Sequence, residues 1–126
     1  MSRSTQQRAA IRACLEAAPG PLLPEEVLAI AQRECPTLGQ ATVYRTLAAL
    51  ELEGDVERVV AADGRARFEP TRVHHHHFAC RSCDRVFDVE GCRSSAAALT
   101  RGLPEGFVLE GHDVWLQGLC AECAAA

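Results

Sequence analysis

Three segments in the first half of the chain carry apolar residues at the spacing of an amphipathic helix. The first covers residues 5–17, the second begins at Pro24, and the third follows Gly39. Proline fits the first turn of a helix, and a glycine such as Gly54 commonly ends one. The apolar positions that share a face are Ile11, Cys14, Leu15 and Ala18; Val27, Leu28 and Ala31; and Val43, Leu47 and Leu50. The pattern predicts three helices, with a short turn between the second and the third.

Two short segments after these helices have the pattern of a β-hairpin. Residues 56–60 and 66–69 alternate weakly, as strands do, and Asp63-Gly64 lies in the turn between them. Three helices followed directly by a hairpin predict a winged helix-turn-helix. The composition changes at Pro70-Thr71-Arg72, where we place a domain boundary between residues 1–70 and 71–126.

The second half predicts a small α/β domain. We expect strands at residues 73–79, 85–89 and 107–116, and a helix at residues 94–101. A pair of cysteines separated by two residues follows the first of these strands, and a second such pair follows the last. The predicted fold class is therefore α+β, with a winged helix followed by a small α/β domain.

Composition and charge limit the classes of function. Hydrophobic residues make up 48% of the chain and charged residues 24%, which is typical of a globular protein, and no apolar run is long enough to cross a membrane. The N-terminus has no signal-peptide pattern, so we expect a cytoplasmic protein with reduced thiols. The net charge is −4. A DNA-binding surface would therefore have to be a local cluster of arginines on an acidic body.

Four of the seven cysteines have the spacing of a zinc site. Cys80 and Cys83 form one pair, Cys120 and Cys123 form the other, and 36 residues separate the pairs. Two such pairs can complete a tetrahedral shell of four sulfur ligands, which predicts a structural Zn²⁺. A redox dithiol and two disulfides are the alternatives. Two of the remaining cysteines, Cys14 and Cys35, have the pattern of small apolar residues. The seventh, Cys92, is either an inconsequential thiol or a redox-sensitive one.

Four consecutive histidines lie in the first predicted strand of the second half. Alternate side chains of a strand share a face, so His75 and His77 point one way and His74 and His76 the other. Each pair is half of a metal site. We expect Glu69 and Asp88 to complete the first site and His112 to join the second. Solvated histidines on an edge strand are the alternative for both pairs.

These blocks together resemble the ferric uptake regulator (Fur) family over nearly the whole chain. The matching blocks are residues 6–8 (QQR), 39–47 (GQATVYRTL), 63–69 (DGRARFE), 74–83 (HHHHFACRSC) and 118–123 (GLCAEC). The resemblance implies a homodimeric, metal-activated transcriptional repressor of metal-homeostasis genes. It also implies binding to AT-rich inverted repeats in double-stranded DNA, a C-terminal domain that dimerises, and no membrane partner.

The resemblance assigns three metal sites to residues of this chain. The structural zinc falls on the four cysteines, and the sensing site falls on Glu69, His75, His77 and Asp88. An auxiliary site takes His74, His76 and His112, but Ser95 stands where the family usually has a glutamate.

The identity of the sensed metal stays open between Zn²⁺ and Fe²⁺, with Mn²⁺ and Ni²⁺ as further alternatives. Residues 20–23 (GPLL) lack the additional histidine of iron and peroxide sensors, which favours four-coordinate zinc. Glu69, in contrast, stands where zinc regulators of the family commonly have a cysteine. Glu57 is a further candidate ligand.

The same sequence predicts the DNA contacts. Thr42, Tyr44 and Arg45 lie off the apolar stripe of the third helix, where Tyr44 could contact thymine methyl groups and Arg45 a guanine or a phosphate. Simple packing is the alternative for Tyr44. Arg65 at the tip of the hairpin could enter the minor groove, and Arg8 is a further candidate. The competing functions are a zinc-stapled interaction module without DNA binding and a metal-dependent hydrolase.

Overall fold

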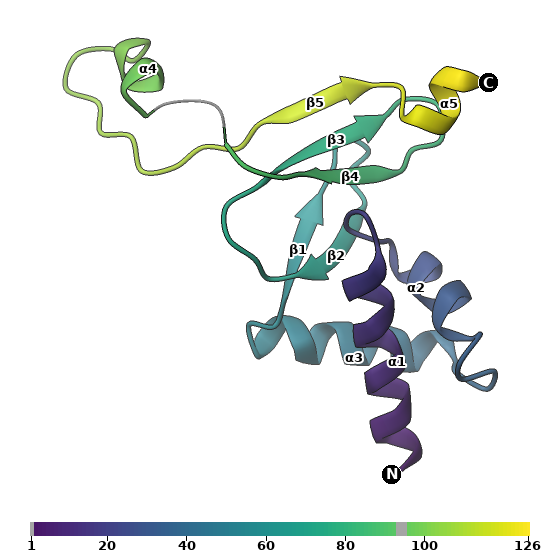
Figure 1. Ribbon diagram of the computed structural model, residues 1–126. Coiled ribbons are helices and arrows are strands. Elements are labelled where there is room, and N and C mark those ends of the chain that lie inside the picture. The colour runs from purple at the N-terminus through teal and green to yellow at the C-terminus, as the bar shows by residue number, and fades with distance from the viewer. Residues whose placement is uncertain (1, 93–95) are drawn as a thin grey trace.

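The computed structural model describes residues 2–92 and 96–126 (Figure 1). Its first half contains three helices and a hairpin: α1 (Arg3–Ala17), α2 (Pro24–Ala31), α3 (Gln40–Leu52), β1 (Val56–Val60) and β2 (Ala66–Pro70). Its second half contains β3 (His76–Cys80), β4 (Val86–Val89), α4 (Ala96–Arg101), β5 (Trp115–Gly118) and α5 (Ala121–Ala125). The three predicted helices and the hairpin are confirmed, with bounds that differ by a few residues. No described helix is long and apolar enough to span a membrane.

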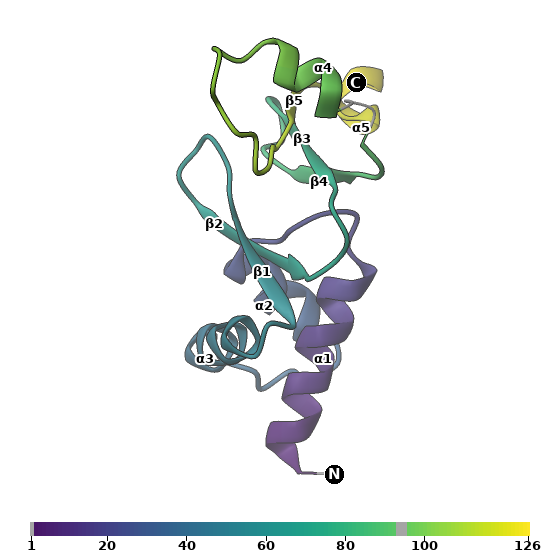
Figure 2. The same cartoon turned by 90° about the vertical axis from the view of Figure 1, so that its left-hand side faces the viewer.

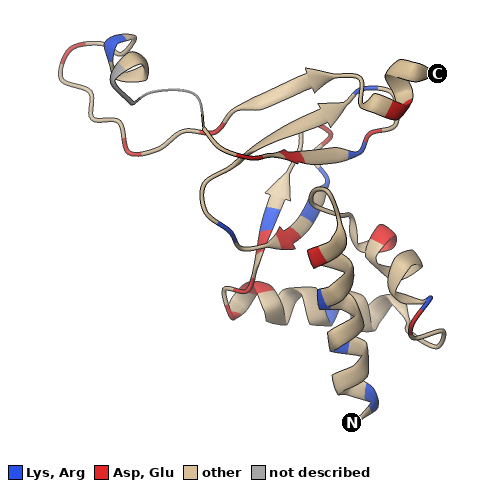
Figure 3. Cartoon of the chain, in the orientation of Figure 1, with Lys and Arg blue, Asp and Glu red and all other residues tan. Residues whose placement is uncertain are grey.

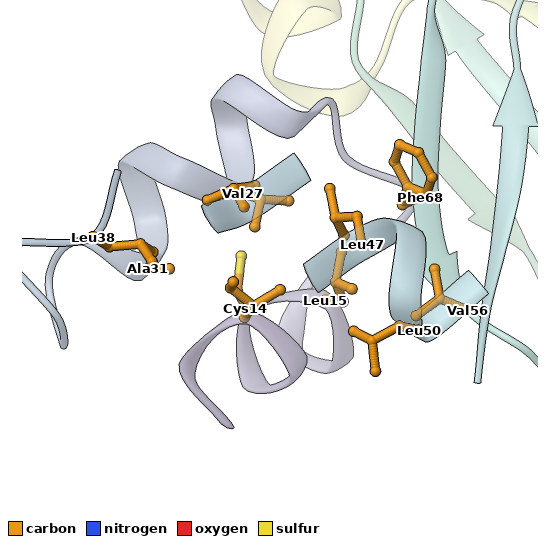
Figure 4. Packing of buried hydrophobic residues seen from close by; sticks show 11 residues of the cluster. Cys14, Leu15, Val27, Ala31, Leu38, Leu47, Leu50, Val56 and Phe68 are labelled. Atoms are coloured by element: carbon orange, nitrogen blue, oxygen red, sulfur yellow. The ribbon is translucent and has the colours of Figure 1, made fainter. Parts of the chain in front are cut away.

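The three helices pack their apolar faces against one another and against β2 (Figure 4). Ile11, Val27, Val43 and Leu50 are completely buried, and Phe68 of β2 joins them. Local contacts set the helix ends. The Ser2 hydroxyl accepts a hydrogen bond from the backbone of α1, and Pro24 occupies the first turn of α2. The core of the first half is therefore made by the residues whose spacing predicted it.

The hairpin is antiparallel and leads from this core towards the second half (Figure 2). Its register runs from Val56 opposite Pro70 to Val60 opposite Ala66, and Gly64 adopts a positive φ of 77° in the turn. Leu22, in the loop between α1 and α2, exchanges two backbone hydrogen bonds with Phe68. This loop therefore extends the two-stranded sheet on the β2 side.

The second sheet has the order β4-β3-β5. β3 pairs antiparallel with β4 and parallel with β5, and the connection from β4 to β5 carries α4, which projects away from the sheet (Figure 1). The α1–α2 loop lies directly against β4. Pro19 O accepts a hydrogen bond from Asp88 N, and a Cβ added to Gly20 would lie only 2.1 Å from Val86 O. Only glycine fits at this contact.

One predicted strand is largely wrong. The sequence predicted a strand over residues 107–116, but only Trp115 and Leu116 of that range belong to β5, which continues to Gly118. Phe107 and Val108 are 62% and 82% exposed. Strands need a paired neighbour, and β3 pairs with this part of the chain only from Trp115 onwards. The helix predicted at 94–101 is observed from Ala96, and residues 94 and 95 lie outside the described part of the chain.

Candidate metal centres

Three clusters of metal-ligating side chains lie in or beside the second sheet. In each cluster the four ligand atoms lie within 4.8 Å of one another. The clusters are Cys80, Cys83, Cys120 and Cys123; Glu69, His75, His77 and Asp88; and His74, His76, Cys92 and His112. The first two combine the side chains that the sequence had grouped. The third contains the three histidines expected there, together with a cysteine that the sequence had not assigned.

The four-cysteine cluster joins the β3–β4 turn to α5. Cys83 Sγ lies 3.9 Å from Cys120 Sγ, close to the separation of about 3.8 Å expected for two thiolates on a tetrahedral zinc ion. All seven cysteines are free of disulfides. The backbone N–H groups of Cys120 and Cys83 donate to Cys80 and lower its pKa to about 6. One thiol is thus already prepared to ionise, and the geometry fits a zinc ion.

Arg85 donates hydrogen bonds to two sulfurs of this cluster. Its guanidinium lies 3.3 Å from Cys83 Sγ and 3.6 Å from Cys120 Sγ, and it also forms an ion pair with Glu122 at 2.8 Å. Four thiolates around one Zn²⁺ carry a net charge of −2, which a neighbouring cation reduces. No motif in the sequence identifies Arg85, because its role depends on the start of α5 lying beside the β3–β4 turn.

The second cluster brings two imidazoles and two carboxylates to one point. His75 Nε2 and His77 Nε2 lie 2.7 and 3.0 Å from the same oxygen of Glu69, and 3.3 and 3.4 Å from Asp88 Oδ1. These separations agree with the roughly 3.3 Å expected between tetrahedral ligands at zinc–nitrogen and zinc–oxygen bond lengths. His75 and His77 therefore point to the same site, as the alternation of side chains along a strand predicted. The alternative of solvated histidines is wrong for this pair, because both rings are buried.

The environment of this cluster favours a bound cation. Glu69 is fully buried, and burial opposes its ionisation, but hydrogen bonds from His77 and His75 outweigh that effect and lower its pKa. Its second oxygen has no hydrogen-bond partner among the described residues. His75 donates from Nδ1 to Val73 O at 3.0 Å, so Nε2 is the nitrogen that faces the carboxylates and would bind a metal after losing its proton. A buried ionised carboxylate beside available imidazole nitrogens is suited to a divalent metal.

Two residues near this cluster have roles that the sequence did not predict. Glu57 faces Glu69 across the hairpin register, but its carboxylate is not among the four converging ligand atoms. Arg72, which the sequence did not single out, forms an ion pair with Asp88 and lies 3.8 Å from Glu69. The α1–α2 loop adds no ligand, because residues 18–23 (APGPLL) contain no side chain that binds a metal. The cluster therefore consists of two imidazoles and two carboxylates.

The third cluster lies on the opposite face of the histidine strand. His74 Nε2 is 3.3 Å from His112 Nε2, and Cys92 Sγ is 3.1 Å from the same nitrogen. His76 is only 5% exposed, and burial together with the neighbouring His74 and His112 lowers its pKa, which favours the neutral, ligating form. No sequence signal points to Cys92, a single thiol that approaches the histidines only in the folded chain.

The residues predicted to contact DNA lie on the surface of the first half. Tyr44 is 48% exposed, and Arg45 donates to Thr42 at 3.2 Å on the same side of α3. Arg8 and Arg65 form ion pairs with Glu53 and Glu25. Figure 3 shows basic residues spaced along α1 and acidic residues gathered where α3 meets β1. Among the described ion pairs none involves Arg45, so its charge is available to a ligand.

The comparisons with known proteins agree with this architecture. The Ferric uptake regulator family model matches residues 1–117. The transcriptional regulator FurA of Mycobacterium bovis is 36% identical over 91 residues, which is 71% of this chain and 61% of FurA. The chain thus spans less than two thirds of that relative. The zinc uptake regulation protein of Mycobacterium tuberculosis is 32% identical over 122 residues, which is 96% of this chain and 94% of the relative.

Solved structures show the same arrangement of elements. A zinc-bound manganese uptake regulator superposes with a TM-score of 0.81 at 28% identity, covering 94% of this chain and 91% of its own. FurB from M. tuberculosis, described as a zinc uptake regulator, has a TM-score of 0.52 at 29% identity, with 96% and 95% covered. The predicted fold class, α+β with a winged helix followed by a small α/β domain, is therefore confirmed. With a family match that covers residues 1–117, the chain belongs to the ferric uptake regulator family.

Proposed function

We propose that the chain is a metal-responsive, DNA-binding transcriptional repressor of metal-homeostasis genes. The observation that carries this proposal is the position of the second cluster. Glu69 belongs to the hairpin of the first half, whereas His75, His77 and Asp88 belong to the segment and sheet beyond it. The ligands therefore connect a helical unit with DNA-binding architecture to a separate sheet. Residues 1–70 act as the DNA-binding domain and residues 71–126 as the dimerisation and metal-binding domain.

The four cysteines serve as the structural zinc site in this proposal. They connect the β3–β4 turn to α5, and their separations fit tetrahedral Zn²⁺. Each ligand of the site comes from the second half, so this zinc stabilises the dimerisation domain itself. The assembly we propose is a homodimer on an AT-rich inverted repeat, because two symmetric half-sites match a protein two-fold axis.

The second cluster acts as the sensing site. When Glu69 and Asp88 are held on one cation with the two imidazoles, the hairpin and the second sheet are fixed at one angle. In a dimer that angle sets the spacing between the two α3 helices, so DNA binds the fixed form better. Linkage then requires that metal and DNA raise each other's affinity equally. Two imidazoles and two carboxylates suit four-coordinate Zn²⁺, and Fe²⁺, Mn²⁺ and Ni²⁺ are the alternatives that experiment separates.

The proposed DNA surface combines α3 and the hairpin turn. Tyr44 and Arg45 read the major groove, supported by Thr42, and Arg65 approaches the minor groove. Arg8 and Arg65 are engaged with carboxylates in the free protein. On DNA they would exchange those partners for phosphates, so their net contribution is smaller than that of Arg45.

The test is fluorescence anisotropy on an AT-rich inverted repeat, with each divalent metal added to protein that retains its cysteine-bound zinc. Metal should tighten binding of the parent protein. The variant Arg45→Ala should lose about 1–3 kcal/mol of DNA binding free energy at any metal concentration, the usual value of a good base contact. Arg101→Ala, an exposed arginine of α4, is the matched control and should bind normally. DNA affinity that ignores every added metal would contradict the sensor and favour an interaction module without DNA binding.

A further inference from the structure

We propose that Cys92 supplies the fourth ligand of a third metal site, a tetrahedral centre of three imidazoles and one thiolate that binds a zinc-like ion. The other ligands are His74, His76 and His112. The family resemblance brings only these three histidines to the chain, and it leaves a serine at the position of the usual glutamate. The thiolate ligand is an inference from the folded structure alone.

The distances within the cluster fit tetrahedral coordination. All four ligand atoms lie within 4.8 Å of one another. The separation of 3.3 Å between His74 Nε2 and His112 Nε2 equals the value of about 3.3 Å expected for two imidazoles on one zinc ion. Cys92 Sγ lies 3.1 Å from the same His112 nitrogen.

A buried nitrogen of His76 gives independent support. His76 is 5% exposed, and its Nε2 has no hydrogen-bond partner among the described residues. A buried polar atom without a partner costs about 1–3 kcal/mol, which a metal bond would recover. The other ring nitrogen, Nδ1, accepts a hydrogen bond from Val114 N at 3.1 Å. Coordination through Nε2 would place the ring proton on Nδ1, so we expect the Val114 amide to move away when the ion binds.

The ligand set selects the kind of ion. A thiolate with three imidazoles favours borderline-soft ions such as Zn²⁺ and Co²⁺ over Mn²⁺ and Mg²⁺, which prefer oxygen ligands. The second cluster, with its two carboxylates, is the harder of the two sites. The two faces of the histidine strand therefore differ in metal preference, and one chain can hold two exchangeable ions of different types.

The four side chains come from three separate segments of the second half. His76 begins β3 and His74 lies two residues before it, Cys92 follows β4, and His112 lies in the segment before β5. An ion on these ligands would hold together the two ends of the β4–β5 connection, which carries α4. The inference concerns a site separate from the sensing cluster, so it does not depend on the proposed repressor function.

Cobalt titration of the full-length protein with its cysteine-bound zinc in place tests the inference. Co²⁺ bound to a thiolate absorbs in the near ultraviolet, whereas Co²⁺ on histidine and carboxylate ligands does not. The parent protein should show this band, and Cys92→Ser should lose it and bind Co²⁺ at this site at least about 100-fold more weakly, since even outer ligand contacts contribute 10- to 100-fold. The matched control is Cys35→Ser, a cysteine outside all three clusters, which should keep the band.

Zinc content measured after each titration excludes cobalt in the four-cysteine site as the source of the band. A second readout is alkylation of Cys92, which zinc should slow in the parent protein but not in His112→Ala. A band that persists in Cys92→Ser with zinc retained, or alkylation that zinc never slows, would overturn the inference. Failure of the repressor proposal would look different, because DNA binding would ignore metal while the band that depends on Cys92 remained.

Discussion

The two halves of this chain are stabilised in different ways. The first half buries a continuous apolar cluster that joins all three helices to the hairpin. The buried side chains of the second half are instead mostly potential metal ligands, among them His75, His76, His77, Cys80 and Cys120, and Val86 is the buried aliphatic residue among its described positions. A domain this small has too little apolar surface to fold securely on its own. We therefore propose that metal binding takes the place of a hydrophobic core in the second half.

The largest effect should come from breaking the four-cysteine site. Cys123→Ser removes one ligand, and a structural zinc is worth about 10–16 kcal/mol of apparent binding free energy in small domains. We expect the second half to lose its order while the helices remain. Trp115, the single tryptophan, lies in β5 against His77, so its fluorescence reports on the second half. Helical circular dichroism reports on the first. Simultaneous loss of both signals would show that the halves are not independent.

A substitution that leaves a cavity in the first half should destabilise the helices and leave the second half unchanged. Leu47 is 1% exposed in the centre of the helical cluster. Leu47→Ala should reduce the free energy of unfolding by about 2–5 kcal/mol, through lost apolar contacts and the space left behind. Urea denaturation followed by circular dichroism measures this loss. Zinc content and Trp115 fluorescence in the absence of urea should match the parent protein, and a loss of zinc would contradict the comparison.

A smaller effect is expected at the cluster shared by the halves. Glu69→Gln keeps the shape of the side chain but removes the charge that both histidines face. The affinity for the exchangeable metal should fall by about 100-fold, or roughly 2.7 kcal/mol, because the ligand becomes a neutral amide. Competition with a chromophoric chelator measures it, while the cysteine-bound zinc provides the internal control. Undiminished affinity would remove Glu69 from the site.

The smallest effect should come from replacing Arg72, and it should be an increase in metal affinity. Its guanidinium pairs with Asp88 and lies near Glu69, so it competes with a cation for the same carboxylates. Arg72→Met keeps much of the aliphatic length and removes the charge. We expect metal affinity to rise about threefold to tenfold, a modest change because the side chain is partly exposed to solvent. A decrease would mean that Arg72 orients Asp88 more than it competes.

The sequence predicted those parts of the fold that depend on local pattern. Helix spacing, Pro24, Gly54 and the turn at Gly64 each act within a few residues, and all four lie where the pattern indicated. The alternation of the histidines was equally decisive, because the two faces of a strand are fixed by its geometry. Two of the three clusters followed from this alternation and from the cysteine spacing.

The errors and omissions arise where distant segments meet. The strand predicted at 107–116 failed because an apolar run forms a strand only where another strand pairs with it. Cys92 and Arg72 were missed as neighbours of ligands, since their positions depend on how the connection after β4 and the segment before β3 are arranged. Pairing partners and approach of loops are tertiary properties, which the spacing of residues in one sequence does not contain.

The fit of Gly20 has a consequence for how the two halves move. The α1–α2 loop contacts β4 through Pro19 and β2 through Leu22, immediately beside the ligands Asp88 and Glu69. Because these two backbone contacts link the loop to both sheets, we expect any rotation between the halves to have its axis close to the loop. A side chain at position 20 would displace the loop from β4, since its Cβ would overlap the β4 backbone. Such a substitution would therefore uncouple the orientation of one half from that of the other.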